Sequence, residues 1–129
     1  MIRTAICDDD VYIIDQIQRW LQEIAEELRI RVDIERFSDG TEIVNAMKEK
    51  SRFHIIFMDI VMEELDGLSA AVQIRERDWN TIIIYISNHK DYVFQSFEAR
   101  PFHYLLKPIE RERGCKFFCV YGSNKATLT

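Results

Sequence analysis

Five short apolar runs alternate with segments of helical periodicity, and this alternation most constrains the fold of the chain. The runs lie at residues 2–7, 31–37, 53–58, 81–86 and 102–106. The third and fourth runs are almost continuously apolar, as is typical of central strands that helices cover on both faces. Strands that alternate with helices favour a parallel sheet with right-handed crossovers. The sequence therefore predicts an α/β fold with a five-stranded parallel sheet.

The segments between these runs carry apolar residues at helical spacing. In the first segment they recur at intervals of three or four residues, at Ile14, Ile17, Leu21, Ile24 and Leu28. Asp10 precedes this pattern, where a helix cap is expected. Similar spacing predicts helices from Ile43, after Gly67 and over residues 91–98.

Composition and charge exclude several functions. The 129 residues fit one domain, and 17 basic against 22 acidic side chains give a net charge of −5. No stripe of Lys and Arg follows the chain, so we expect no direct nucleic acid binding by this segment. No apolar stretch approaches the roughly 18 residues of a membrane span, and the acidic run 8–10 is unlike a signal peptide, so we expect a cytoplasmic protein. Cys7, Cys115 and Cys119 are too few and too scattered to favour a zinc site over reduced thiols.

Polar residues stand at the ends of four predicted strands, where parallel sheets collect ligands. Asp8 and Asp9 follow the first strand, Asp59 the third, Ser87 the fourth and Lys107 the fifth. Clustered carboxylates repel one another, so a cation belongs among them, and Mg²⁺ prefers such oxygen ligands. Asp9 and Asp59 would bind it directly, and Asp8 through water. Asp59 could then attack a phosphoryl group whose charge Mg²⁺ and Lys107 offset, with Ser87 donating its hydroxyl.

These residues, in this order, resemble bacterial response regulator receiver domains. Asp59 lies 50 residues after Asp9, Ser87 lies 28 residues after Asp59, and Lys107 lies 20 residues after Ser87. These intervals are similar to those of that family. The resemblance implies a flavodoxin-like, doubly wound sheet with strand order 2-1-3-4-5. It also implies that Asp59 accepts a phosphoryl group from a sensor histidine kinase.

The resemblance assigns further roles. Asp9 would be a direct metal ligand, and the backbone carbonyl of Val61 another. The bond between Lys107 and Pro108 would be cis, and Tyr104 would move with the hydroxyl of Ser87 when the site is phosphorylated. A partner or homodimer contact through the fourth helix and fifth strand would then change.

A Mg²⁺-dependent phosphatase or phosphotransferase is the alternative, because such enzymes also use an aspartate nucleophile. They usually need a second carboxylate two residues after it, whereas Val61 occupies that position here. This favours a regulatory domain, not an enzyme, whose chemistry is its own phosphorylation and dephosphorylation. Asn88 or His89 are candidates for orienting the hydrolytic water in place of Val61.

The chain also departs from the family pattern. Residues 62–67 lack the frequent Met-Pro pair, so this loop is expected to be less rigid, and Ser87 replaces a frequent threonine. Residues 92–98 and 102–109 resemble receivers joined to LytTR-type DNA-binding domains, which control transcription.

The likeness to receivers covers residues 1–112, and residues 113–129 form an atypical tail. Residues 115–122 have the aromatic and β-branched composition of a strand, so the fifth helix is expected to be shortened or missing. The tail fits the start of a truncated effector domain, an altered end or a cloning feature. Loss of the helix would uncover apolar strands, so the tail is a second candidate for a dimer contact.

Overall fold

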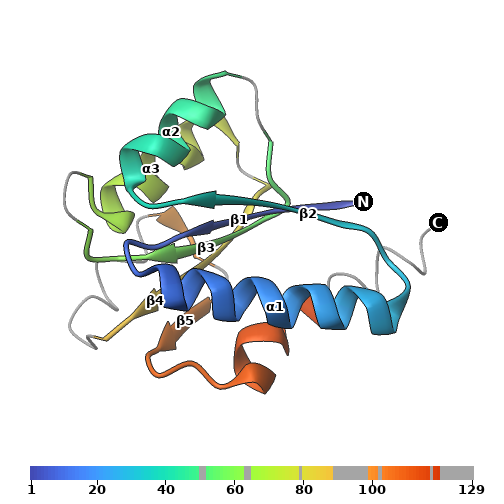
Figure 1. Cartoon of the computed structure of the whole chain (residues 1–129). Helices are drawn as coiled ribbons and strands as arrows, with labels where there is room; N and C mark the ends of the chain where they lie inside the picture. Colours follow the sequence, from blue (N-terminus) through green and yellow to red (C-terminus); the bar gives the residue numbers. More distant parts are fainter. Residues whose placement is uncertain are drawn as a thin grey trace.

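The computed structural model describes residues 1–49, 52–62, 65–78, 80–88, 99–101, 103–116 and 118–119. Strands and helices alternate along these residues (Figure 1). The elements are β1 (Ile2–Cys7), α1 (Val11–Leu28), β2 (Val32–Phe37), α2 (Gly40–Lys48), β3 (Ile55–Asp59), α3 (Gly67–Arg77), β4 (Ile82–Ser87) and β5 (His103–Leu106). The helix predicted over residues 91–98 lies outside the described residues.

The five strands form one parallel sheet in the order β2-β1-β3-β4-β5. This confirms the flavodoxin-like, doubly wound arrangement. In the register, Asp59 stands opposite Ile86, and Ser87 opposite Leu106. The carboxyl ends of the four strands β1, β3, β4 and β5 therefore lie along one edge of the sheet.

The sheet separates two apolar cores. Helices α2 and α3 cover one face and α1 covers the other, as Figure 1 shows. Every residue of β3 is buried, which explains why this run carries almost no polar side chain. Side chains alternate between the faces, so that Ile56 and Met58 enter one core and Ile55 and Phe57 the other.

Helices α1, α2 and α3 each follow an aspartate whose side chain accepts a backbone hydrogen bond. Asp10 caps α1 through Tyr12, Asp39 caps α2 through Thr41, and Asp66 caps α3 through Ser69. The cap predicted at Asp10 is confirmed. Among the described residues, no helix has both the length and the apolar character needed to cross a bilayer.

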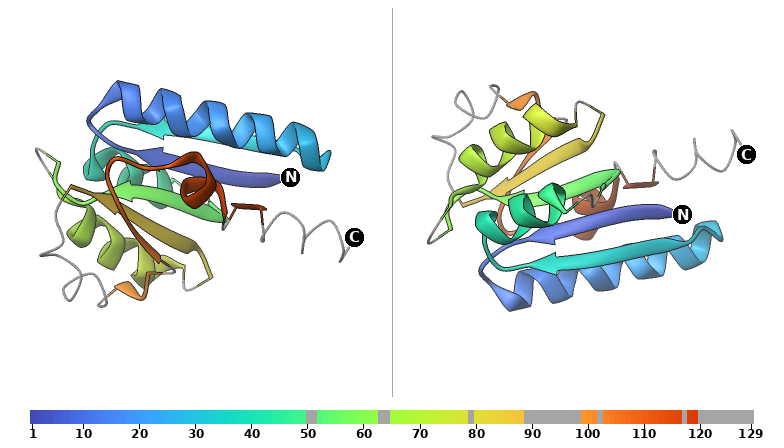
Figure 2. Two further views of the ribbon diagram at one scale, coloured as in Figure 1. Left: turned by 90° about the horizontal axis from the view of Figure 1, so that it is seen from below. Right: turned by 90° about the horizontal axis from the view of Figure 1, so that it is seen from above.

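The carboxyl-terminal segment corrects one prediction. Residues 111–116 and 118–119 are helical, so the strand expected from residue 115 is wrong at these positions, and the fifth helix is not missing. Figure 2 shows this helical segment on the same side of the sheet as α1. Cys115 and Phe118 are buried in the core beneath it.

Tertiary contacts explain the helical outcome. Cys115 and Phe118 are three residues apart, a spacing that fits one face of a helix as well as a short strand pattern. The apolar face of α1 is there to receive them, and Arg111 forms ion pairs with Glu23 and Glu27 of α1 at 3.3 and 3.7 Å. Packing against α1 therefore decides what composition left ambiguous.

Candidate functional site

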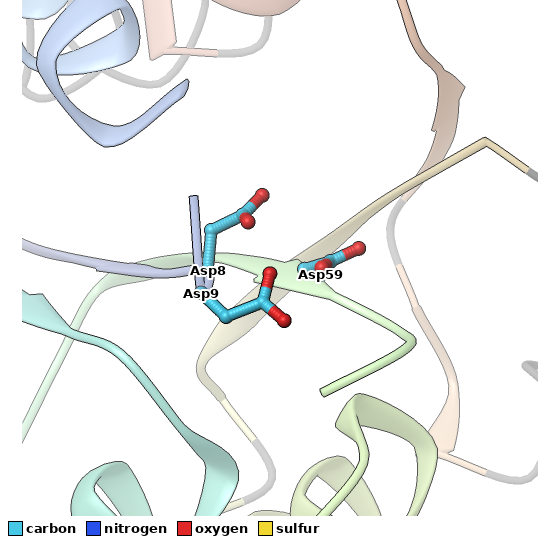
Figure 3. A group of neighbouring side chains, drawn as sticks. All are labelled: Asp8, Asp9 and Asp59. Atoms are coloured by element: carbon cyan, nitrogen blue, oxygen red, sulfur yellow. The ribbon is translucent and has the colours of Figure 1, made fainter. Parts of the chain in front are cut away.

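Three carboxylates meet at the carboxyl edge of the sheet. Asp8 and Asp9 follow β1, and Asp59 ends β3 (Figure 3). Each offers an oxygen atom within 4.8 Å of the oxygens of the other two. Asp8 and Asp59 are buried, with 0% and 4% of their surface exposed, whereas Asp9 is exposed. The cluster is therefore open to solvent on the side of Asp9.

Lys107 brings a positive charge to this cluster. Its Nζ lies 3.0 Å from Oδ2 of Asp8 and 3.6 Å from Oδ1 of Asp59. Lys107 directly follows β5, and its backbone N–H donates to the carbonyl of Ser87 at 2.8 Å. The bond between Lys107 and Pro108 is cis, as expected.

Burial and mutual repulsion make the ionised form of these carboxylates unfavourable, as the pKa values of the cluster show. Burial, followed by the charge of Asp8, raises the pKa of Asp59 from 3.8 to about 7. Burial also raises the pKa of Asp8, against the opposing effects of the Asp10 N–H and Lys107. Burial alone would lower the pKa of Lys107, but its contacts with Asp8 and Asp59 outweigh this and raise it. Among the described residues, Lys107 therefore does not compensate the three carboxylates by itself.

The donor set fits Mg²⁺. Carboxylate oxygens are the hard ligands that this ion takes, and it commonly uses one or two carboxylates together with waters and a phosphate. The exposed Asp9 leaves room for such waters, and the raised pKa of Asp59 reflects a site that favours an added cation. Asp9 and Asp59 would hold the ion directly, and Asp8 would contact it through water.

Ser87 and Val61 lie on the segments that leave the same edge. Ser87 is buried and is the last residue of β4. It follows Ile86, which pairs with Asp59 in the sheet. Val61 lies two residues beyond Asp59, and 48% of its surface is exposed. Asn88 is exposed, and His89 lies outside the described residues.

Tyr104 lies on β5. It pairs with Tyr85 across the register of β4 and β5, and the two ring centroids are 6.2 Å apart. Tyr104 is partly buried against the core between the sheet and the helices α2 and α3. Its position beside β4, the strand that ends at Ser87, is compatible with the predicted switch role, which stays a prediction.

Gly67 is a structural residue of the site that the sequence pattern marked only as a helix start. A Cβ atom at this position would collide with the carbonyl oxygen of Asp59. The Gly67 N–H donates to the carbonyl of Ile60 at 2.7 Å, which folds the loop back on the end of β3. The available sequence signal was the Asp-Gly pair, a common turn sequence.

A parallel sheet with acidic residues and a lysine converging at its carboxyl edge defines a class of α/β proteins whose site could hold a cation. The family model described as the response regulator receiver domain matches residues 4–117. The chain therefore belongs to the response regulator receiver domain family, and the resemblance found in the sequence is confirmed.

Relatives and solved structures agree with this assignment. The chain is 28% identical over 105 residues to the transcriptional regulatory protein YpdB of Escherichia coli K12, covering 81% of this chain and 41% of YpdB. It is 30% identical over 116 residues to the transcriptional regulatory protein BtsR of the same strain, covering 88% and 45%. The chain thus spans less than half the length of these relatives. A CheY-like receiver domain from Methanospirillum hungatei shares the fold with a TM-score of 0.83 at 16% identity, over 100% and 99% of the two chains.

Proposed function

We propose that the chain is a phosphorylation switch of a bacterial two-component system, and that Asp59 accepts a phosphoryl group from a sensor histidine kinase. The observation that carries the proposal is the joint approach of Lys107 to the buried Asp8 and Asp59, beside the exposed Asp9. Membership of the receiver family supports the signalling role.

The chemistry needs Asp59 as a carboxylate. One oxygen attacks the phosphorus of a phosphohistidine, the P–N bond breaks, and its electrons and a proton go to the leaving imidazole. Asp9, Asp59 and the carbonyl of Val61 would hold Mg²⁺, with Asp8 acting through water, and the ion would supply charge that offsets the phosphoryl oxygens. Lys107 pairs with one of these oxygens, and the hydroxyl of Ser87 donates to another.

The phosphoryl group would act as a signal through Ser87 and Tyr104. Ser87 would move toward the new oxygens and Tyr104 would follow it. The face of β5 and of the helix predicted over residues 91–98 would then change its partner contacts, including a homodimer contact. YpdB and BtsR are named transcriptional regulators, which supports an output in transcription. The output would require an effector of the LytTR type, and the protein would act in the cytoplasm.

The alternative phosphatase or phosphotransferase role has less support. The second carboxylate that such enzymes usually place two residues after the nucleophile is replaced by Val61. The signalling role therefore remains the better account of this site.

Incubation with acetyl phosphate and Mg²⁺, followed by intact-mass measurement, tests the proposal. We expect one phosphoryl group per native chain and none on Asp59→Asn, which retains the shape of the side chain. Asp66→Asn changes a helix-capping aspartate outside the carboxylate cluster and is the control that should still be labelled. Equal labelling of Asp59→Asn would contradict the assignment of the acceptor.

A further inference from the structure

The loop between β3 and α3 is attached to the amino end of α2. The N–H of Leu65 donates to Oδ2 of Asp39 at 3.4 Å, and the N–H of Gly40 donates to the carbonyl of Leu65 at 3.2 Å. Both polar backbone groups of Leu65 are thus bound by two consecutive residues that lie far from it in sequence. Figure 1 shows α2 and α3 side by side on the same face of the sheet.

Within the described part of the chain, each carboxylate oxygen of Asp39 accepts from a backbone N–H. Oδ1 accepts from the N–H of Thr41 at 2.6 Å and so caps α2, while Oδ2 accepts from the N–H of Leu65. A hydrogen bond to an ionised acceptor is generally stronger than one between neutral groups. One carboxylate therefore joins the start of a helix to the loop beside the phosphoacceptor.

The close approach depends on Gly40. A Cβ atom at this position would collide with the carbonyl oxygen of Leu65 and crowd the side chain of Ala70. The pair Asp39-Gly40 thus combines an acceptor for the loop with the space that the loop needs. At the other end of the loop, the bond from Gly67 to Ile60 holds the chain next to Asp59.

We propose that Asp39 is a positioning residue for the phosphoacceptor site. By holding Leu65, it fixes the start of the segment 65–67, whose Gly67 donates to the carbonyl of Ile60 and lies against the carbonyl oxygen of Asp59, and so keeps the end of β3 arranged for Mg²⁺. The proposal rests on the proposed function, because it assigns the loop to a Mg²⁺ and phosphoryl site.

Asp39→Asn separates the loop contact from the helix cap. The hydrogen bond from the Thr41 N–H is the shorter of the two, so we expect the amide oxygen of the introduced asparagine to accept it. The amide nitrogen then faces the Leu65 N–H and cannot accept a hydrogen bond from it. Glu42→Gln is the matched control, because it removes a carboxylate from the same helix end and keeps an acceptor for the N–H of Ser38. After burial, the charges of both Asp39 and Glu42 raise the pKa of Cys7, so both carboxylates influence this region of the core.

Two measurements on the full chain test the proposal. Amide hydrogen exchange without metal reports on the Leu65 N–H, and calorimetric titration with Mg²⁺ alone gives the dissociation constant. We expect faster exchange at Leu65 in Asp39→Asn and a Mg²⁺ dissociation constant raised by about three- to tenfold, the scale of one hydrogen bond. Glu42→Gln should leave exchange at Leu65 unchanged and alter the constant by less than about twofold, as an exposed charge does.

The outcomes separate this proposal from the proposed function. Unchanged exchange at Leu65, or equal Mg²⁺ constants in the two variants, would overturn the role of Asp39. Mg²⁺ binding by a native chain that acetyl phosphate does not label would overturn only the phosphoacceptor function. A native chain that binds no Mg²⁺ would overturn both. Asp39→Ser, whose short hydroxyl caps α2 without reaching Leu65, replaces Asp39→Asn if that variant does not fold.

Discussion

The proposed chemistry depends on Asp59, and the surroundings of its carboxyl group oppose the ionisation of that group. It is buried beside Asp8, and Lys107 is the cation that the structure brings to both of them. A carboxylic acid with a pKa of about 7 holds a proton under conditions in which an exposed aspartate has lost it. Without a bound cation, ionisation of Asp59 therefore lowers the stability of the fold, and binding of a cation would offset this loss.

The first prediction at this scale concerns pH. The pKa of Asp59 is about 7 in the folded chain and about 3.8 in the unfolded chain, so the folded chain binds this proton more tightly. The stabilising contribution of this proton is therefore complete below about pH 3.8. It decreases as pH rises and is lost above about 7. In EDTA, the melting temperature of Asp59→Asn should therefore exceed that of the native chain by several degrees more at pH 8 than at pH 5. A difference that does not change with pH would contradict the raised pKa.

The second prediction concerns Val61, whose side chain cannot hydrogen-bond a hydrolytic water. Val61→Asn should accelerate loss of the phosphoryl group by about tenfold, the scale of one added hydrogen bond. The measurement is the decay of phosphorylated mass after the donor is removed. Val61→Ala shortens the side chain without adding a polar group and should decay at nearly the native rate. A slower or unaltered rate in Val61→Asn would argue against this explanation.

At the scale of elements, Arg75 joins α3 to the segment that leads into β5. Its guanidinium is buried and donates to the carbonyls of Ala99 at 2.6 Å, Thr81 at 2.6 Å and Arg100 at 3.0 Å. Thr81 directly precedes β4, and the segment 99–101 precedes β5. A single side chain therefore binds the beginnings of the two strands whose far ends carry Ser87 and Lys107.

Replacement of Arg75 should be strongly destabilising. Arg75→Met keeps much of the apolar stem but leaves several buried carbonyls without their donor, at a cost of about 1–3 kcal/mol for each. We expect a loss of about 3 kcal/mol or more in the free energy of unfolding, measured by urea denaturation. Arg77→Met, on an exposed position of the same last turn, should cost less than about 0.5 kcal/mol. Similar losses in the two variants would show that the buried contacts do not matter.

At the scale of the whole molecule, the carboxyl-terminal helical segment covers the core that the sequence pattern had left open. Phe118 is fully buried, which removes the reason for expecting the tail to expose apolar strands and to drive association. Strand β5 lies at the end of the strand order, and Leu106 exposes 43% of its surface there. Edge strands with exposed apolar residues favour pairing with another chain. The β5 face is therefore the better candidate for a dimer contact.

Light scattering measures this association. We expect a monomer without phosphodonor and a doubled molar mass with acetyl phosphate and Mg²⁺, because the proposed switch changes the β5 face. Leu106→Lys should weaken the dimer by at least about tenfold, since a charge replaces buried apolar surface, while Asp59→Asn should stay monomeric. A monomer at all concentrations in the presence of the donor would refute association through β5.

The sequence by itself determined the strands, the helix capped by Asp10 and the family. These features depend on local periodicity and on the residue types at strand ends, and Asp8, Asp59 and Lys107 meet because parallel strands end at one edge. Only the tertiary structure decided the state of residues 115–116 and 118–119 and the attachment of Leu65 to Asp39. The spacing of Cys115 and Phe118 fits both a helix and a strand, and the apolar face of α1 selects the helix. Likewise, the contact between Leu65 and Asp39 arises from the packing of α2 beside α3, which no periodicity within the chain encodes.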